Sequence, residues 1–244
     1  MDADHITKKI EITWTAVAIY HDKGRVSIPD LVQATKLSAT EIYELFPDKK
    51  AILAYYYPAL VLQYWAMIDE IDDFENYSIS EKFSNFIYTL FDMMAEREHF
   101  VNDTFDKLVF RKGSSSDFHE ETSTLFKEFL TTDGNIAVSA GFFMGDTFYK
   151  ILASQYFFLI KYWMNDSSEN KERTLALSHK LTSLFEEIIY NKSLDLGFDL
   201  IKFVFGGMDM ENWLPKFDDW NCSSSINKKK DNTETNIEIE SEDE

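Results

Sequence analysis

Cationic side chains that can neutralise phosphate lie close together near the start of the 244-residue chain. Lys36 falls in a turn between two short helical segments, and Lys49 and Lys50 open a further one. Other cations flank the first helical segment, at Lys8, Lys9 and Arg25. Because phosphate neutralisation supplies most of a protein's non-specific affinity for DNA, these groups are candidate contacts to a nucleic-acid backbone.

Groups that could carry catalysis are scattered along the sequence. The five histidines form no H-E-x-x-H arrangement, and there is no P-loop, G-x-G-x-x-G or G-x-S-x-G motif. His119 precedes Glu120 and Glu121, but a metal site needs a further convergent ligand, and the alternative is a surface histidine with ordinary partners. We therefore expect no catalytic residue, no metal and no cofactor, and we expect that the protein is not an enzyme.

The first helical segment is indicated by apolar residues at intervals of three or four, at Ile6, Ile10, Trp14 and Val17. This spacing places them on one face of a helix that runs to about Asp22. Gly24 can adopt the left-handed conformation that ends many helices, so the helix is predicted to stop there.

Two short helices follow, each with its own start signal. Ser27 has the features of an N-cap, with Asp30 three residues on, and predicts a short helix over 28–34. Ser38 and Glu41 form an S-x-x-E capping box that begins the next helix. Their hydroxyl and carboxylate groups are expected to satisfy the free N–H groups at the helix starts.

The second short helix is predicted to stop before Phe46-Pro47, after which Asp48 caps a long helix extending to Ile68. Two short helices joined by a tight turn, with a supporting helix before them and a long helix after, describe a helix-turn-helix unit. Such a unit would place the second short helix, 38–45, in the major groove of DNA.

Matches in residue type and spacing run through about fifty residues, at Gly24, Ser27, Leu31, Ala34, Leu37-Ser38, Ile42-Tyr43, Phe46-Pro47, Lys49 and Ile52-Leu53. Together they resemble the N-terminal domain of TetR-type transcriptional regulators. The resemblance implies an all-α, TetR-like fold, with an N-terminal three-helix DNA-binding bundle and a larger helical domain for ligand binding and dimerisation. It also implies a homodimer that binds a palindromic operator in double-stranded DNA. We predict that the residues in contact with DNA are Ser27, Lys36, Ser38, Ala39, Thr40, Tyr43, Lys49 and Lys50.

The sequence departs from the family pattern within the recognition helix and the turn before it. Lys36 stands where the family usually has Gly, and a left-handed conformation there would cost roughly 1 kcal/mol. Glu41 either repels DNA phosphates from the first turn or closes its capping box and turns away from DNA. Tyr43 either lies near the DNA backbone or packs between helices. The recognition helix itself has no Arg or Lys.

The rest of the chain is also predicted to be helical, because only 8 Gly and 4 Pro interrupt it. Ser78 and Glu81 form another capping box, 112–117 is predicted to be a loop, and 118–130 a further helix. The segment 141–164 is apolar almost all round, which is typical of a helix with one face in the core and another in a subunit interface.

The resemblance implies a four-helix dimer interface formed by 141–164 and 172–190 of each subunit. It also implies a ligand enclosed in the larger domain, where the 21 Phe, 12 Tyr and 5 Trp are the main candidates for lining a pocket. We expect a small apolar or aromatic ligand, with a cationic drug-like molecule left open. Candidate lining residues are Phe91, Phe105, Phe142 and Tyr149, although a place in the ordinary core is the favoured alternative for each.

The chain is acidic overall, with 24 Lys+Arg against 43 Asp+Glu and a formal charge of −19. Residues 1–60 carry only −1, whereas 61–220 carry −14 and 221–244 carry −4. We therefore predict a helix-turn-helix domain at 1–50, a helical ligand-binding and dimerisation domain at 51–220, and a disordered acidic tail at 221–244.

The single cysteine, Cys222, rules out an intrachain disulfide and agrees with a reducing compartment. The N-terminus has no apolar signal region, and the apolar stretch 151–160 is about half of the roughly 20 residues that a membrane-spanning helix needs. We expect a cytoplasmic protein with no membrane partner.

Two functions fit these observations. The first is a homodimeric regulator that responds to a ligand and binds operator DNA. The second is a TetR-fold protein that has lost DNA binding and serves as a lipid-binding or accessory factor, like the ubiquinone-biosynthesis accessory proteins that share this fold. The second is favoured by the acidic residues of the recognition helix and by the aromatic body.

Overall fold

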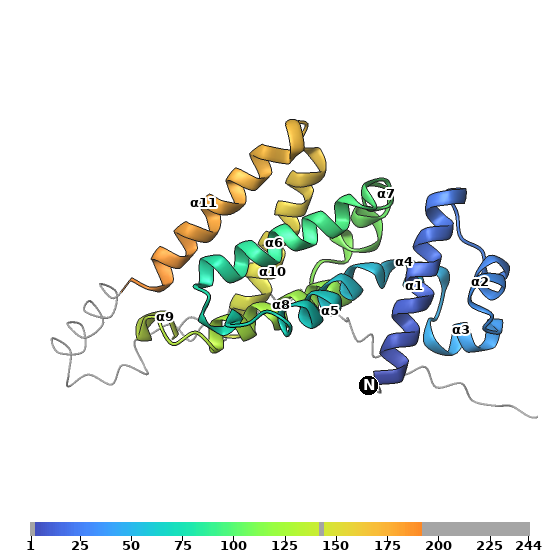
Figure 1. The fold of residues 1–244 in the computed structure, drawn as a ribbon, viewed down its shortest axis with the longest axis horizontal. Helices are drawn as coiled ribbons and strands as arrows, with labels where there is room; N and C mark the ends of the chain where they lie inside the picture. Colours follow the sequence, from blue (N-terminus) through green and yellow to red (C-terminus); the bar gives the residue numbers. More distant parts are fainter. Residues whose placement is uncertain (1–2, 142–143, 192–244) are drawn as a thin grey trace, which may run out of the picture. The chain divides into compact units, whose positions relative to one another are not determined.

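The computed structural model describes residues 3–141 and 144–191, all within the first of the two units into which the chain divides, 1–200. In this described part every regular element is a helix, which confirms the predicted all-α class (Figure 1). Phe142, the apolar stretches after 191 and the predicted acidic tail lie outside the described residues.

The N-terminal helices form as their start and stop signals predict. Helix α1 spans Ala3–Lys23, α2 spans Ile28–Thr35 and α3 spans Ala39–Leu45. Gly24, with a φ of 67°, follows α1 in the left-handed conformation, and Lys36 adopts the same conformation after α2 with a φ of 61°. The lysine is therefore held in a conformation that costs roughly 1 kcal/mol relative to glycine.

These helices share a small apolar core of their own. Its buried members come from α1, α2, α3 and the segment that follows, and they are Ile12, Ala16, Leu31, Ile42, Phe46 and Ile52. The hydroxyl of Thr13 also donates to the carbonyl oxygen of Ile52, 3.3 Å away, inside this core. Helix α3 is thus positioned by Ile42 and Phe46, with Leu45 packed partly against the same core. Its remaining side chains are exposed.

The long helix predicted from 49 to 68 is interrupted. Helix α4 spans Lys49–Ala54 and α5 spans Tyr56–Ile68, with Tyr55 between them. Pro58 explains the break, because it has no N–H to bond to the carbonyl of Ala54 and its ring crowds that carbonyl. The N-cap prediction is confirmed, since the carboxylate of Asp48 accepts from the N–H of Ala51 at 2.7 Å.

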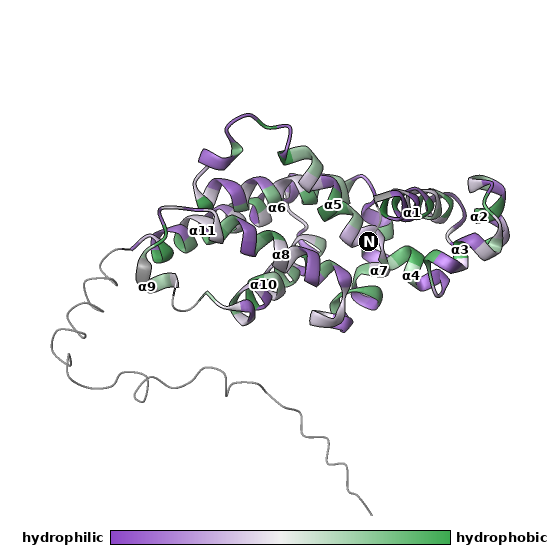
Figure 2. Cartoon of the chain, turned by 90° about the horizontal axis from the view of Figure 1, so that it is seen from below, coloured by the Kyte–Doolittle hydropathy of each residue, from purple (hydrophilic) through white to green (hydrophobic). Residues whose placement is uncertain are grey.

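The body consists of five longer helices and several short ones. The long helices are α6 at Ile79–Ala95, α7 at Glu98–Leu108, α8 at Asp117–Thr131, α10 at Asp146–Asn165 and α11 at Glu172–Ile189. The shorter helices are η1 at Phe74–Asn76, η2 at Phe110–Ser115, α9 at Val138–Gly141 and η3 at Glu169–Lys171. Figure 2 shows hydrophobic and hydrophilic positions mixed around each helix, as expected of amphipathic helices packed on one core.

Two helix pairs organise the body. Helix α8 packs along α10, and α6 packs along α11 (Figure 1). The α6–α11 contact is held by polar groups: the N–H of Ser80 donates to Glu186 at 2.8 Å, and the hydroxyls of Ser84 and Thr182 lie 2.9 Å apart. Small buried residues of α11, Thr174, Ser178 and Thr182, allow the two helices to approach closely.

Three sequence predictions for the body need correction. The segment 141–164 is not one helix, because α9 ends at Gly141 and α10 begins at Asp146 after the N-cap Gly145. The predicted loop at 112–117 is largely the 3-10 helix η2. His119 has hydrogen-bond partners, as predicted, but it is buried and not on the surface. The adjacent Phe118 and, two turns further along α8, Phe126 are buried in the core with it.

A fourth correction concerns which segment of the chain is the longest apolar one. Among the described residues one segment, Lys49–Ile68, is long and apolar enough to cross a membrane by length and composition, and it is longer than the stretch 151–160 considered above. Half of its most apolar window is buried inside the protein. Tyr56, Tyr57 and Leu60 are fully buried there, which is the pattern of a core helix.

The strained turn at Lys36 gives a stability prediction. Replacing Lys36 by Gly should raise the free energy of unfolding by about 0.5–1 kcal/mol, because glycine adopts a positive φ without steric cost. The same replacement in the middle of α11, Lys180→Gly, should lower it by about 1 kcal/mol. Urea unfolding monitored by circular dichroism measures both, and two changes of the same sign would contradict the assigned role of Lys36.

Candidate nucleic-acid interface and body sites

The outward face of the recognition helix α3 carries the residues that the sequence singled out. Ser38, Ala39 and Thr40 are exposed at its start, and Ile42 is fully buried beneath them. Tyr43 is 50% exposed, so it does not pack between helices as its alternative interpretation required. The exposed surface of α3 therefore combines small and hydroxyl-bearing side chains with the carboxylates of Glu41 and Glu44.

Glu41 is turned back onto the start of its own helix. Its carboxylate accepts from both the N–H and the hydroxyl of Ser38, each at 2.7 Å, while the N–H of Glu41 donates to the Ser38 hydroxyl oxygen at 3.2 Å. These hydrogen bonds from the Ser38 side chain and backbone lower the pKa of Glu41. Glu41 thus closes the predicted capping box, although its negative charge stays at the start of α3.

The capping hydroxyls are committed to local bonds. The Ser27 hydroxyl accepts from the N–H of Asp30 at 3.3 Å and donates to its carboxylate. Ser38 is engaged in the same way with Glu41. Both serines were predicted as DNA contacts, but their hydroxyls donate to carboxylates within the protein. Their direct role in this structure is to begin α2 and α3.

Three cations remain free to meet phosphate. Lys36, Lys49 and Lys50 are exposed, and none forms an ion pair with another described residue. Neighbouring Lys23 by contrast bonds to Asp30 at 2.5 Å. An ammonium group without a carboxylate partner can bind phosphate without first breaking an ion pair.

The predicted ligand residues that the structure describes lie in the aromatic core of the body. Phe91 stacks on Trp163 with ring centroids 5.5 Å apart, and Phe105 packs against Phe157 at 5.8 Å. Tyr149 is also buried and donates to the carbonyl oxygen of Met144 at 3.2 Å. None of Phe91, Phe105 and Tyr149 lines either of the two hollows described below.

A groove of about 500 Å³ lies beside α10 and α11 and carries no charged side chain. Its rim consists of exposed apolar residues of those two helices, Phe158, Tyr162, Leu181, Leu184 and Ile188. Its floor consists of buried rings, among them Phe83, Phe126 and Tyr156. The sequence indicated the α10 part through its all-round apolar character, but the shared groove depends on the pairing of helices distant in sequence.

Two buried hydroxyls of the core, those of Thr122 on α8 and Tyr156 on α10, have no hydrogen-bond partner among the residues that the structure describes. Burial raises the pKa of the Tyr156 phenol well above its ordinary value, so the group stays neutral. Buried polar groups are nearly always bonded, and an orphan costs about 1–3 kcal/mol. No sequence pattern marks these two residues, because their burial arises only when α8 packs on α10.

His119 is held by hydrogen bonds inside the core. Its Nε2 donates to the carbonyl oxygen of Lys150 at 2.9 Å and lies 3.0 Å from the Ser154 hydroxyl, and burial lowers its pKa. Within residues 3–141 and 144–191, no group of three or more His, Cys, Asp or Glu is placed to hold a metal ion. The histidine therefore ties α8 to α10 as a neutral side chain.

The exposed short helix α3 on a small N-terminal core, followed by a larger helical body, is the arrangement that the sequence predicted. A comparison with protein families agrees: residues 82–204 match the family described as "Tetracyclin repressor-like, C-terminal domain". The match covers just over half of the chain, so the protein belongs to the tetracycline repressor-like, or TetR, family of regulators. A search of curated proteins found no match.

The orphan hydroxyl of Tyr156 gives a second stability prediction. Tyr156→Phe removes the unpaired oxygen and keeps the ring, so the free energy of unfolding of the ligand-free protein should rise by about 1 kcal/mol. As a matched control, Tyr57→Phe should lower it by about 1 kcal/mol, because the Tyr57 hydroxyl lies 2.8 Å from that of Thr104. A destabilised Tyr156→Phe protein would show that this hydroxyl has a partner.

Proposed function

We propose that the protein is a homodimeric transcriptional regulator of the cytoplasm that binds a palindromic operator and responds to a small, uncharged, apolar ligand. The observation that carries the proposal is the recognition helix α3, whose Ala39, Thr40 and Tyr43 face outward beside three unpaired lysines. Membership of the TetR family supports it.

We propose that one set of side chains positions the protein on the DNA backbone and another set recognises the base sequence. Lys36, Lys49 and Lys50 bind backbone phosphates, while Thr40 and Tyr43 face the groove. Glu41 meets the DNA with its carboxylate already bonded to Ser38, which reduces the repulsion but does not remove it. With so few cations in each subunit, affinity depends on two half-sites bound by one dimer.

Dimerisation is proposed to use the outer faces of α10 and α11. Phe158 is 59% exposed and Leu184 55%, and both lie on the rim of an uncharged groove. Large contiguous apolar surfaces mark interaction sites, and a two-fold contact would cover the same surface on both subunits. The side of α11 that packs on α6 carries Thr182, Phe185 and Glu186. Leu181, Leu184 and Ile188 stay exposed on α11 and are left for a second copy.

The ligand is proposed to be neutral because no charged side chain lines the groove. A buried ion without a partner is strongly disfavoured, so an uncharged molecule fits these walls best. The ring of Tyr156 belongs both to the groove floor and to the core where its hydroxyl is unpaired. A ligand oxygen or nitrogen that reached this hydroxyl would satisfy it.

The second candidate function is an accessory or lipid-binding protein that no longer binds DNA. The observation that favours it is the recognition helix itself, which contains Glu41 and Glu44 and no Arg or Lys. The groove of about 500 Å³ suits an acyl chain as well as a drug-sized molecule. DNA binding is therefore the property that separates the two functions.

DNA binding can be tested by selecting genomic fragments with the purified protein at about 50 and 200 mM salt. One palindromic sequence should be enriched, and Lys49→Glu should abolish the enrichment by reversing a phosphate contact. Lys180→Glu, an equal charge change on α11, should not. Failure to enrich any palindrome at either salt concentration would exclude the regulator, and an apolar molecule seen by native mass spectrometry would then favour the accessory protein.

The dimer can be tested by analytical ultracentrifugation. Leu184→Asp introduces a charge into the apolar rim and should shift the protein from dimer to monomer, at a cost of several kcal/mol of association free energy. His179→Asp, which places the same charge on the opposite, exposed side of the same helix, should remain dimeric. A wild-type protein that sediments as a monomer at micromolar concentration would contradict the proposed interface.

A further inference from the structure

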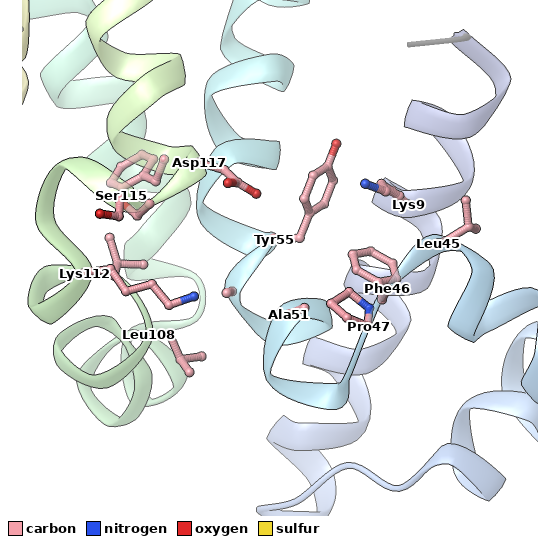
Figure 3. A pocket seen from close by; sticks show the side chains of 14 residues that line it. Lys9, Leu45, Phe46, Pro47, Ala51, Tyr55, Leu108, Lys112, Ser115 and Asp117 are labelled. Atoms are coloured by element: carbon pink, nitrogen blue, oxygen red, sulfur yellow. The ribbon is translucent and has the colours of Figure 1, made fainter. Parts of the chain in front are cut away.

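A second hollow, distinct from the groove, lies where the N-terminal helices meet the body. It has a volume of about 180 Å³ (Figure 3). One side comes from Lys9 of α1, the end of α3 and the α4–Tyr55 segment, and the other from the end of α7, η2 and the start of α8. A molecule held here would touch both parts at once.

The first unusual feature of this junction cavity is Lys9. Its side chain is half-buried, and its ammonium lies 5.5 Å from the ring centroid of Phe46 and 5.3 Å from that of Tyr55. In Figure 3 the ammonium points toward the Tyr55 ring. No described carboxylate pairs with it, so two ring faces are the main compensation for a partly desolvated charge.

The second feature is another cation on the opposite wall. Lys112 of η2 lines the cavity, and it also forms no ion pair within the described ranges 3–141 and 144–191. Asp117 is the single acid among the lining residues, against two ammonium groups. Among the lining residues, positive charges therefore outnumber negative ones by one, in a protein whose net charge is −19.

The remaining walls are apolar and limit the size of an occupant. Phe46, Leu108, Val109 and Phe118 line the cavity. Its volume is below the roughly 300–1,000 Å³ of sites for drug-sized molecules, so a single aromatic ring with one small substituent is the expected scale. The ring would lie against these side chains, and its substituent would meet the ammonium groups.

The surrounding acids determine where a negative group can lie. Burial raises the pKa of Tyr55, and the charges of Glu121 and Asp117 raise it further. An incoming anion is repelled by the carboxylates of Asp117 and Glu121 and attracted to the ammonium groups of Lys9 and Lys112 on the two walls. A cation would find its place on the Phe46 and Tyr55 rings already occupied by Lys9.

We propose that the junction cavity binds a small aromatic monocarboxylate, whose carboxylate pairs with Lys9 and Lys112 and whose ring packs on the apolar wall. Such a molecule would link α1 to η2 and so join the recognition unit to the body. The site differs from the groove of α10 and α11 in position, size and charge, and it does not depend on dimerisation or on DNA binding.

The test uses benzoate as the probe, with benzamide as its neutral analogue and benzylamine as its cationic one. Isothermal titration calorimetry and thermal unfolding are measured on the full chain at constant ionic strength. Benzoate should bind saturably and raise the unfolding temperature, whereas benzamide and benzylamine should bind at least about tenfold more weakly because they lack a carboxylate.

Variants locate the site. Lys9→Met and Lys112→Met remove one charge each and keep an apolar stem, so each should weaken benzoate binding roughly tenfold or more. Lys8→Met and Lys107→Met, neighbouring exposed lysines outside the cavity, should leave it unchanged. A steric variant, Ala54→Leu, fills the cavity without altering charge and should also abolish binding.

The proposal is overturned by any of three results. The first is no saturable benzoate binding to the wild-type protein. The second is binding that is equally strong for benzamide or benzylamine. The third is benzoate binding that persists in Lys9→Met and Lys112→Met or in Ala54→Leu, which would place the molecule elsewhere, such as in the groove.

Discussion

Ring packing between α8 and α10 is the interaction on which the rest of the body depends. Tyr156 of α10 has its ring 6.3 Å from Phe118 and 6.2 Å from Phe126 of α8, and Phe157 stacks on Phe118 at 5.1 Å. Each such pair contributes about 0.5–1.5 kcal/mol beyond the area it buries. Tyr156 and Phe157 of α10 are buried by this packing, whereas Phe158 and Tyr162 of the same helix remain exposed. The exposed rings form part of the rim of the groove, so the groove results from the same packing. The unpaired hydroxyl of Tyr156 is another product, because the aromatic neighbours offer it no acceptor.

Local signals in the sequence predicted the helix-turn-helix unit well. The N-caps at Ser27, Ser38 and Asp48 and the left-handed turns at Gly24 and Lys36 depend on residues within four positions of one another, so a sequence contains all the information needed. The break after Ala54 could also have been read from Pro58, four residues on, and was missed because the apolar spacing continues through it.

Features that arise from distant pairing could not be predicted in the same way. His119 follows Phe118 and precedes two acids, a pattern equally typical of a surface, and only the approach of α10 buries it. The junction cavity likewise joins Lys9, Tyr55 and Lys112, which no local pattern relates. For the DNA face, the sequence identified the exposed residues, whereas the structure showed that the Ser27 and Ser38 hydroxyls are already bonded to Asp30 and Glu41.

Pro58 removes a hydrogen bond from the connection between α4 and α5 as well as breaking the helix. A continuous helix resists bending because each carbonyl is tied to an N–H four residues on, and at Ala54 that tie is missing. The connection between α4 and α5 therefore lacks one helical hydrogen bond beside Tyr55, the residue whose ring centroid also lies 5.3 Å from the ammonium of Lys9. The break in the helix and the contact between Lys9 and Tyr55 therefore lie in the same turn of the chain.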